Sequence, residues 1–186
     1  MTFNPFSSSN IQPWLPSDNN LLITNGDPKE FNNNFTLIAG TIYLVKWQIR
    51  NAIPTLSNII LFTASGGSGA STGSFCGIYN SAGTRIAISA DCATQFQSGF
   101  VPITIPLLTP IALSGGFVWV AFVSNLAVTQ PQIGTSLGNG NVTNLGLTAA
   151  NYAFCVNGTG ATALPATITP ASNSLTGNQS FWAGGN

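Results

Sequence analysis

The sequence predicts an all-β fold, an antiparallel β-sandwich of jelly-roll or immunoglobulin-like topology, with a closed barrel as the lesser alternative. Six or seven short stretches show period-two alternation or β-branched runs, and Gly, Asn and Pro separate them. No stretch sustains the period of an amphipathic helix. With 186 residues, the chain is long enough to form one domain with a sizeable core.

Composition divides the chain into three parts. Residues 1–34 are rich in Asn, Ser and Pro with scattered large apolar side chains, which predicts an extended N-terminal arm docked through those side chains. Residues 35–158 contain the predicted strands and form the sandwich domain. Residues 159–186 are rich in Pro, Thr, Ser and Gly, and we expect an extended C-terminal tail that packs on the sandwich or on a neighbouring subunit.

The first strands are predicted from alternation. Residues 41–50, "TIYLVKWQIR", alternate apolar with polar side chains and predict a strand with one dry face. Residues 57–64, "SNIILFTA", predict a second strand that is apolar on both faces. Residues 65–74, "SGGSGASTGS", predict a flexible loop, since Gly and Ser supply nothing for a core.

A hairpin is predicted next, with strands at residues 75–80 and 84–92 and a three-residue loop ending in Gly. Pairing outward from the loop places Cys76 opposite Ile88 rather than Cys92, so we expect no disulfide between these two cysteines. With Cys155 the chain has three cysteines, an odd number, and buried reduced thiols are the expected state. The same register puts three isoleucines on the face of Cys76 and Cys92: Ile78, Ile86 and Ile88.

The remaining strands differ in their expected position. Residues 100–108 contain two prolines and predict an edge strand, because proline cannot donate to a central ladder. Residues 115–125 are apolar on both faces and predict a central strand. Residues 126–150 predict a long loop, and residues 151–158 predict the last strand.

Low charge limits the possible partners. Four basic and four acidic residues make up 4% of the chain. Without a basic patch the protein has no surface for nucleic acid and no cationic face for an anionic membrane. The longest apolar run is too short to cross a bilayer, so no membrane insertion is expected.

The sequence also favours a protein without catalysis. It contains no histidine, which removes the commonest general base and any Ser-His-Asp arrangement. The spacing of the carboxylates indicates neither a glycosidase pair nor a calcium loop. We therefore expect no catalytic residue, no cofactor and no metal site.

Aromatic residues are the remaining candidates for binding, since sugars stack on aromatic faces. Trp47 and Trp119 lie on predicted core faces. The candidates for contact with a glycan or another subunit lie at the two ends of the chain and are Trp14, Phe181 and Trp182. Anchoring of the arm and tail to the sandwich is the competing interpretation of these residues.

Five segments carry a resemblance, in order: "PWLPSDNNLLITNGDP" (13–28), "LIAGTIYLVKWQIR" (37–50), "FCGIYNSAGTRIAISAD" (75–91), "SGFVPITIPLLTPIALSGGFVWVAFVSN" (98–125) and "SFWAGG" (180–185). Together they resemble the β-sandwich domain of tail-fibre and minor tail proteins of tailed bacteriophages. Each piece is weak alone, and their order carries the resemblance.

The resemblance implies a virion surface protein, assembled in the host cytoplasm, that forms a homo-oligomer, often a trimer, with other virion proteins as neighbours. It implies attachment to the host cell surface, with a bacterial surface glycan as the expected ligand, and it brings no catalytic residues. The alternative is a capsid decoration or head-fibre protein that stabilises the particle without binding a receptor.

Overall fold

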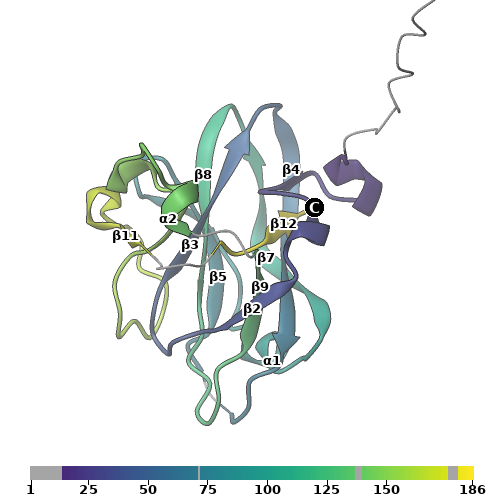
Figure 1. Ribbon diagram of the computed structural model, residues 1–186, viewed down its shortest axis with the longest axis vertical. Helices are drawn as coiled ribbons and strands as arrows, with labels where there is room; N and C mark the ends of the chain where they lie inside the picture. Colours follow the sequence, from purple (N-terminus) through teal and green to yellow (C-terminus); the bar gives the residue numbers. More distant parts are fainter. Residues whose placement is uncertain (1–13, 71, 137–139, 176–179) are drawn as a thin grey trace, which may run out of the picture.

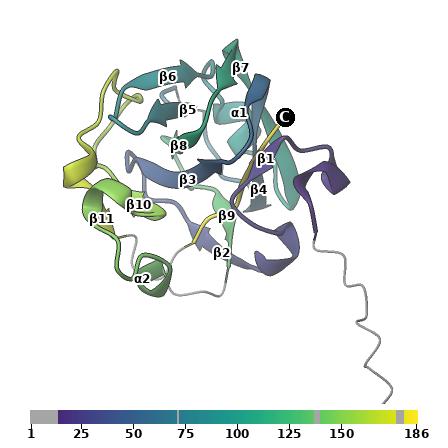
Figure 2. The ribbon, with the colours of Figure 1, turned by 90° about the horizontal axis from the view of Figure 1, so that it is seen from above.

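A computed structural model describes residues 14–70, 72–136, 140–175 and 180–186. It confirms the all-β antiparallel sandwich: two sheets of six strands pack face to face (Figures 1 and 2). Every pairing between named strands is antiparallel. The short helices of the described residues lie in the connections between strands.

The first sheet runs β1 (Ile23–Thr24), β12 (Ala183–Gly185), β4 (Ile53–Ser65), β9 (Gln132–Thr135) and β2 (Asn33–Thr36), with β7 (Val101–Leu113) on the other side of β4. The second sheet runs β11 (Ser174–Leu175), β10 (Phe154–Val156), β3 (Tyr43–Ile49), β8 (Gly116–Val123), β5 (Phe75–Asn80) and β6 (Arg85–Ile88). The helical turns are η1 (Pro16–Asn19), η2 (Pro28–Glu30), α1 (Ala93–Phe96), α2 (Gly140–Thr143), η3 (Ala149–Asn151) and η4 (Pro170–Ser172).

Both ends of the chain contribute strands to the first sheet. β12 lies between β1 and β4. It pairs with residues 59–61 of β4 (Figure 1) and, on its other side, with β1. β2 spans the predicted boundary between arm and sandwich at residue 34. The segments that the sequence assigns to the arm and the tail thus contribute strands that complete this sheet. Residues 1–13 of the arm lie outside the described residues.

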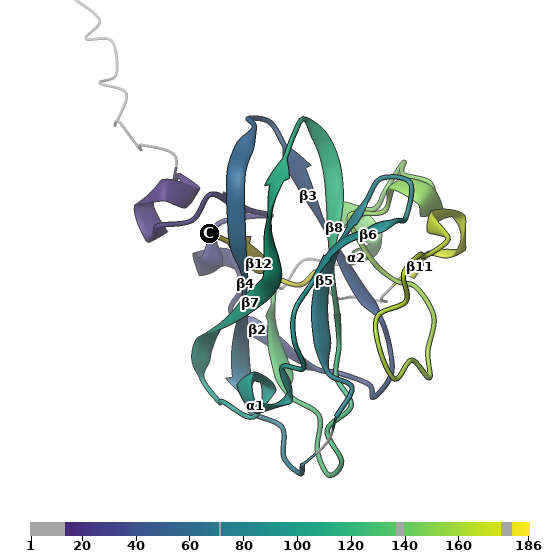
Figure 3. The same cartoon turned by 180° about the vertical axis from the view of Figure 1, so that it is seen from behind.

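The second sheet is buried on both faces. Alternate residues of β8, namely Val118, Val120 and Phe122, point into the core between the sheets. The residues between them, such as Trp119, pack in a second cluster beneath residues 157–172, which run beside β6 (Figure 3). This double burial explains why the sequence of β8 is apolar on both faces. Trp47 and Trp119 are fully buried, as predicted.

The predicted register of the hairpin is correct only next to the loop, where Tyr79 pairs with Arg85, and is wrong farther along the strands. β5 and β6 pair Gly77 with Ile88 and Ile78 with Ala87, and a bulge leaves Ile86 as an extra residue before Arg85 pairs with Tyr79. One inserted residue reverses the faces beyond it. Ile86 is therefore exposed and Ile88 packs on the outer cluster, while Ile78 alone of the three isoleucines shares the core with Cys76 and Cys92.

Other elements differ in length or were missed. β7 pairs with β4 and with no other named strand, as expected of an edge strand, but it continues to Leu113. The predicted loop at 126–150 contains β9 and α2. β9 has only four residues, and Gly134 within it lies against Phe62, so its sequence carried little strand signal.

Candidate functional site

A groove lined by aromatic and proline side chains lies on the outer face of the first sheet. It has a volume of about 250 Å³. Its lining residues are Pro28, Phe31, Phe62, Pro102 and Trp182. They come from η2 and the residue after it, from β4, from β7 and from the residue before β12, so the groove (the aromatic groove hereafter) exists only once the sheet has formed.

Strand alternation and two fixed contacts position the groove. Leu61 points into the core, so Phe62 on the next position points outward, beside its cross-strand partner Pro102. The indole Nε1 of Trp182 donates a hydrogen bond to the backbone oxygen of Gly26 at 3.1 Å. Trp182 also packs with buried Leu21 and Ile60, which fixes its ring in the wall of the groove.

Phe100, next to the groove, is the most unusual exposed aromatic residue in the described chain. It is 81% exposed, and its ring meets that of Phe62 edge to face, with centroids 5.8 Å apart. Its φ of 54° lies in the left-handed region, which costs a residue with a Cβ roughly 1–2 kcal/mol. A solvent-exposed aromatic ring held on a strained backbone makes Phe100 a candidate for a binding surface.

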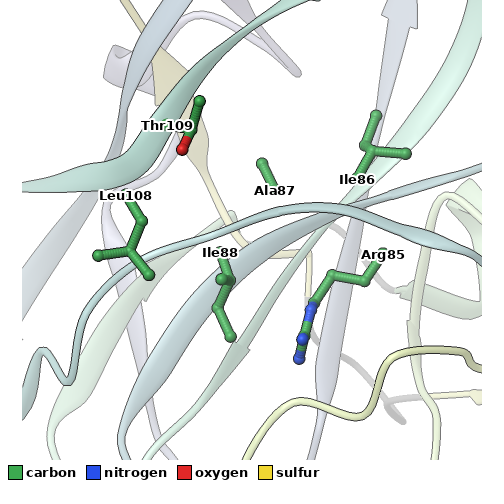
Figure 4. A pocket seen from close by; sticks show the side chains of 6 residues that line it. All are labelled: Arg85, Ile86, Ala87, Ile88, Leu108 and Thr109. Atoms are coloured by element: carbon green, nitrogen blue, oxygen red, sulfur yellow. The ribbon is translucent and has the colours of Figure 1, made fainter.

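A second hollow of about 270 Å³ lies where β6 of the second sheet faces β7 of the first (Figure 4). It is lined by Arg85, Ile86, Ala87, Ile88, Leu108 and Thr109. The Arg85 side chain extends away from Leu108 and Thr109, and its guanidinium donates a hydrogen bond to the backbone oxygen of Leu164. Because its only charged group already has a partner, this hollow offers less binding chemistry than the aromatic groove.

The three site residues predicted from the sequence do not come together. Trp182 lines the aromatic groove. Phe181 is fully buried, in contact with Tyr43 and Phe122, so its ring cannot reach a glycan or another subunit. Trp14 is half-buried just before η1 and does not line the groove.

Sequence reasoning missed most of the groove. Phe62 could have been found, because it alternates with the core residues of β4. Phe31 and Pro102 carry no local signal, since they meet only through the pairing of distant segments. The exposure of Phe100 depends on a left-handed backbone that no residue pattern announces.

Three of the four carboxylates accept hydrogen bonds from backbone N–H groups. Asp91 accepts hydrogen bonds from the backbone N–H groups of Gly73 and Ala93, at 2.6 and 3.0 Å. Asp18 and Asp27 accept from backbone N–H groups within three residues of themselves. Among the described residues, no cluster of three Cys, Asp or Glu side chains could hold a metal ion.

All three cysteines are buried and reduced, as predicted. Burial raises the pKa of Cys76 well above its ordinary value, and a hydrogen bond with the Cys92 side chain adds to this increase. The predicted absence of a disulfide between Cys76 and Cys92 is confirmed, and the β6 bulge and the turn into α1 bring both side chains into one core. Burial raises the pKa of Cys155 to about 12, so neither Cys76 nor Cys155 is an activated nucleophile.

Comparison with known proteins identifies no relative. No model of a protein family matches the chain, and no curated protein sequence matches it. The resemblance to phage tail-fibre domains therefore stays a prediction. Within the described ranges, no helix has the length and apolar character needed to span a bilayer.

Proposed function

We propose that the protein is a surface protein of a tailed-phage virion, of the tail-fibre type, which attaches to the host cell by binding a surface glycan in the aromatic groove. The exposed ring of Phe100 beside the groove is the observation that carries this proposal. The role needs no catalysis, cofactor, nucleic acid or membrane insertion.

The chemistry of the groove suits a neutral sugar. The C–H faces of a sugar ring pack on aromatic faces, and here Phe31, Phe62 and Phe100 supply rings that are not fully buried. No charged side chain lines the groove, so a charged ligand would lose hydration without gaining a partner. Thr104, exposed on β7 on the same face as Pro102, supplies a hydroxyl for the sugar.

We further propose that the protein acts as a homo-oligomer, with a trimer as the expected form. The chain has only eight charged residues, four of each sign. Close subunit packing therefore meets little like-charge repulsion. Light scattering that shows a monodisperse monomer at high protein concentration would contradict this part of the proposal.

The second candidate function is capsid decoration or a head fibre. Several large apolar side chains outside the aromatic groove are strongly exposed: Ile38, Leu108, Val128 and Leu145. Their spread over several elements suits contacts with neighbouring virion subunits. Cryo-electron microscopy of the particle separates the two functions, because the tail-fibre proposal requires the protein at the tail and decoration requires it on the head.

Replacing Phe100 tests glycan binding. We expect Phe100→Ala to weaken binding about three- to tenfold, because one stacked ring contributes about 0.5–1.5 kcal/mol. Phe100→Tyr keeps the ring and should bind nearly as well as the parent protein. The measurement is a glycan array with purified protein, followed by titration calorimetry on each glycan that binds.

Leu145→Ala is the matched control. Leu145 is 82% exposed, similar to Phe100, but it follows α2 and does not line the aromatic groove. Its removal should leave glycan binding unchanged. Equal losses in the Phe100→Ala and Leu145→Ala proteins, or no binding to any bacterial surface glycan, would overturn the proposed function.

A further inference from the structure

A hollow larger than the aromatic groove lies in the seam between the two sheets. It has a volume of about 700 Å³, within the range of about 300–1,000 Å³ typical of small-molecule sites. One wall is formed by η1 and β1, and the other by β3 and the turn that follows it. β1 and β3 lie beside each other there, as Figure 2 shows from above.

The seam is open because both strands lack a neighbour on that side. β1 is the outermost strand of the first sheet. On β3, the partner strand β10 pairs only with residues 43–45, and the backbone N–H of Lys46 makes the last contact, with the Ala153 oxygen at 2.8 Å. Beyond Lys46, the edge of β3 faces the hollow.

Positive charge is concentrated in this hollow. Lys46 and Arg50, two of the four basic residues in the chain, line it, and no carboxylate does so among the residues that the structure describes. The Lys46 Nζ donates a hydrogen bond to the Asn151 oxygen at 3.0 Å and lies 4.2 Å from the centre of the Phe117 ring. These contacts fix one cation at the wall.

Arg50 is available to a ligand. Its side chain is exposed, and it makes no hydrogen bond or ion pair with any residue in the described ranges. A guanidinium presents paired N–H donors that match the two oxygens of a carboxylate. Asp18 follows the lining residue Ser17 but does not line the hollow, and its carboxylate accepts a hydrogen bond from the backbone N–H of Leu15 at 2.9 Å.

Neutral side chains around Arg50 suit a sugar ring. The exposed side chains of Ser17 and Asn51 line the hollow, and neither makes a hydrogen bond within the described structure. Both can therefore bind sugar hydroxyls. Leu15 and Leu22, each about half exposed, present apolar surface to the C–H face of a ring.

We propose that this hollow binds a carboxylate-bearing sugar, with the Arg50 guanidinium paired to the carboxylate and Lys46 adding a fixed positive charge. The site goes beyond the proposed function, because the aromatic groove is uncharged and lies on the outer face of the first sheet. The ligand is an acidic saccharide unit, such as a uronic or sialic acid.

The test compares acids with their neutral esters. The probes are trigalacturonate, a hyaluronan tetrasaccharide and 3′-sialyllactose, each measured by titration calorimetry beside its methyl ester, which keeps the ring and hydroxyls but loses the charge. We expect at least one acid to bind about tenfold tighter than its ester, the factor that one charge-assisted hydrogen bond supports. Inorganic phosphate should compete only weakly.

Matched variants assign the binding to the hollow. Arg50→Gln should weaken binding of that acid about tenfold, whereas Lys29→Gln removes the same charge at an exposed position outside the hollow and should leave binding unchanged. Circular dichroism checks that both variants are folded. Phe100→Ala should leave binding of the acidic sugar unchanged while it weakens binding in the aromatic groove, so this inference and the proposed function can fail separately.

Three results would overturn the inference. The first is equal binding of every acid and its ester, or no binding of any acid at millimolar concentration. The second is an equal effect of Arg50→Gln and Lys29→Gln. The third is competition by inorganic phosphate as strong as that by the sugar, which would indicate an anion site without sugar recognition.

Discussion

Phe181 shows how one side chain joins the parts of this fold. Its ring is fully buried and meets Tyr43 and Phe122 of the second sheet edge to face, with centroid distances of 5.2 and 5.3 Å. It meets Phe35 of β2 at 5.8 Å. Phe181 thus links the second sheet to β2 of the first sheet.

We predict that Phe181→Ala lowers the free energy of unfolding by about 3–5 kcal/mol, because it leaves a cavity and removes three aromatic contacts. Urea denaturation followed by fluorescence measures the change. Phe100→Ala is the control, since it removes the same ring from an 81% exposed position and should change stability by about 1 kcal/mol or less. Similar losses in the two variants would contradict the buried position of Phe181.

The element that most depends on close contact is β12. It is only three residues long, yet it fills the space between β1 and β4. The C-terminal Asn186 continues the contact, accepting hydrogen bonds from the backbone N–H groups of Ser57 and Asn58 at 2.7 and 2.9 Å. Its glycines allow this approach, because a Cβ on Gly185 would lie 2.7 Å from the Trp47 ring.

We predict that Gly185→Ala lowers the free energy of unfolding by about 1–3 kcal/mol, since Trp47 and Leu56 are fully buried and cannot move aside cheaply. Gly115→Ala is the control: nothing lies within 4 Å of a Cβ there. Thermal unfolding should show a lower midpoint for Gly185→Ala and an unchanged or slightly higher one for Gly115→Ala. An unchanged midpoint for both would show that β12 packs less closely than described.

The edge strand β7 limits how copies of the protein can associate. The backbone of Asn58 pairs with Asn186 on the β12 side, so the position of the missing N–H of its cross-strand partner Pro106 points to the edge of β7 that faces away from β4. Pro102 has the same parity, and on this edge Ser89 bridges Leu107. The edge therefore lacks donors at two prolines and is partly covered, which discourages sheet extension by a neighbouring strand. Side-chain surfaces then mediate any oligomer at this edge.

The molecule as a whole keeps several acidic protons in buried positions. Burial raises the pKa of Tyr79 from 10 to about 12 and that of Cys155 from 9 to about 12, and burial also raises the pKa values of Tyr43 and Cys76. The Tyr79 hydroxyl also donates a hydrogen bond to the Pro165 oxygen at 2.6 Å. These groups stay protonated in the folded protein at pH values where the unfolded chain ionises.

The sign of the pH dependence follows from this difference. The stabilisation is complete below pH 9, because both states are then protonated, and it falls as the pH rises from 9 to about 12, where the unfolded chain gives up protons first. We predict that the free energy of unfolding, measured in urea at pH 7, 9, 10 and 11, decreases steeply only above pH 9.

The Tyr79→Phe variant tests how much Tyr79 contributes to the loss of stability above pH 9. The substitution should lower the free energy of unfolding by about 1 kcal/mol at pH 7, because the Pro165 oxygen loses its donor. Between pH 9 and 11, the variant should lose less stability than the parent protein. Parallel pH profiles for the two proteins would contradict the assignment.

The sequence by itself determined the all-β class, the strands with clear alternation, the edge position of the proline-rich strand, and the burial of Trp47, Trp119 and the three cysteines. These features depend on side chains a few residues apart, where period and composition report which face of a strand is buried. Only the tertiary structure decided the β6 bulge, the insertion of β12 between β1 and β4, and the meeting of Phe31, Phe62, Pro102 and Trp182 in one groove. Strand pairing between distant segments sets these features, and periodicity within a strand does not specify which strand lies beside it.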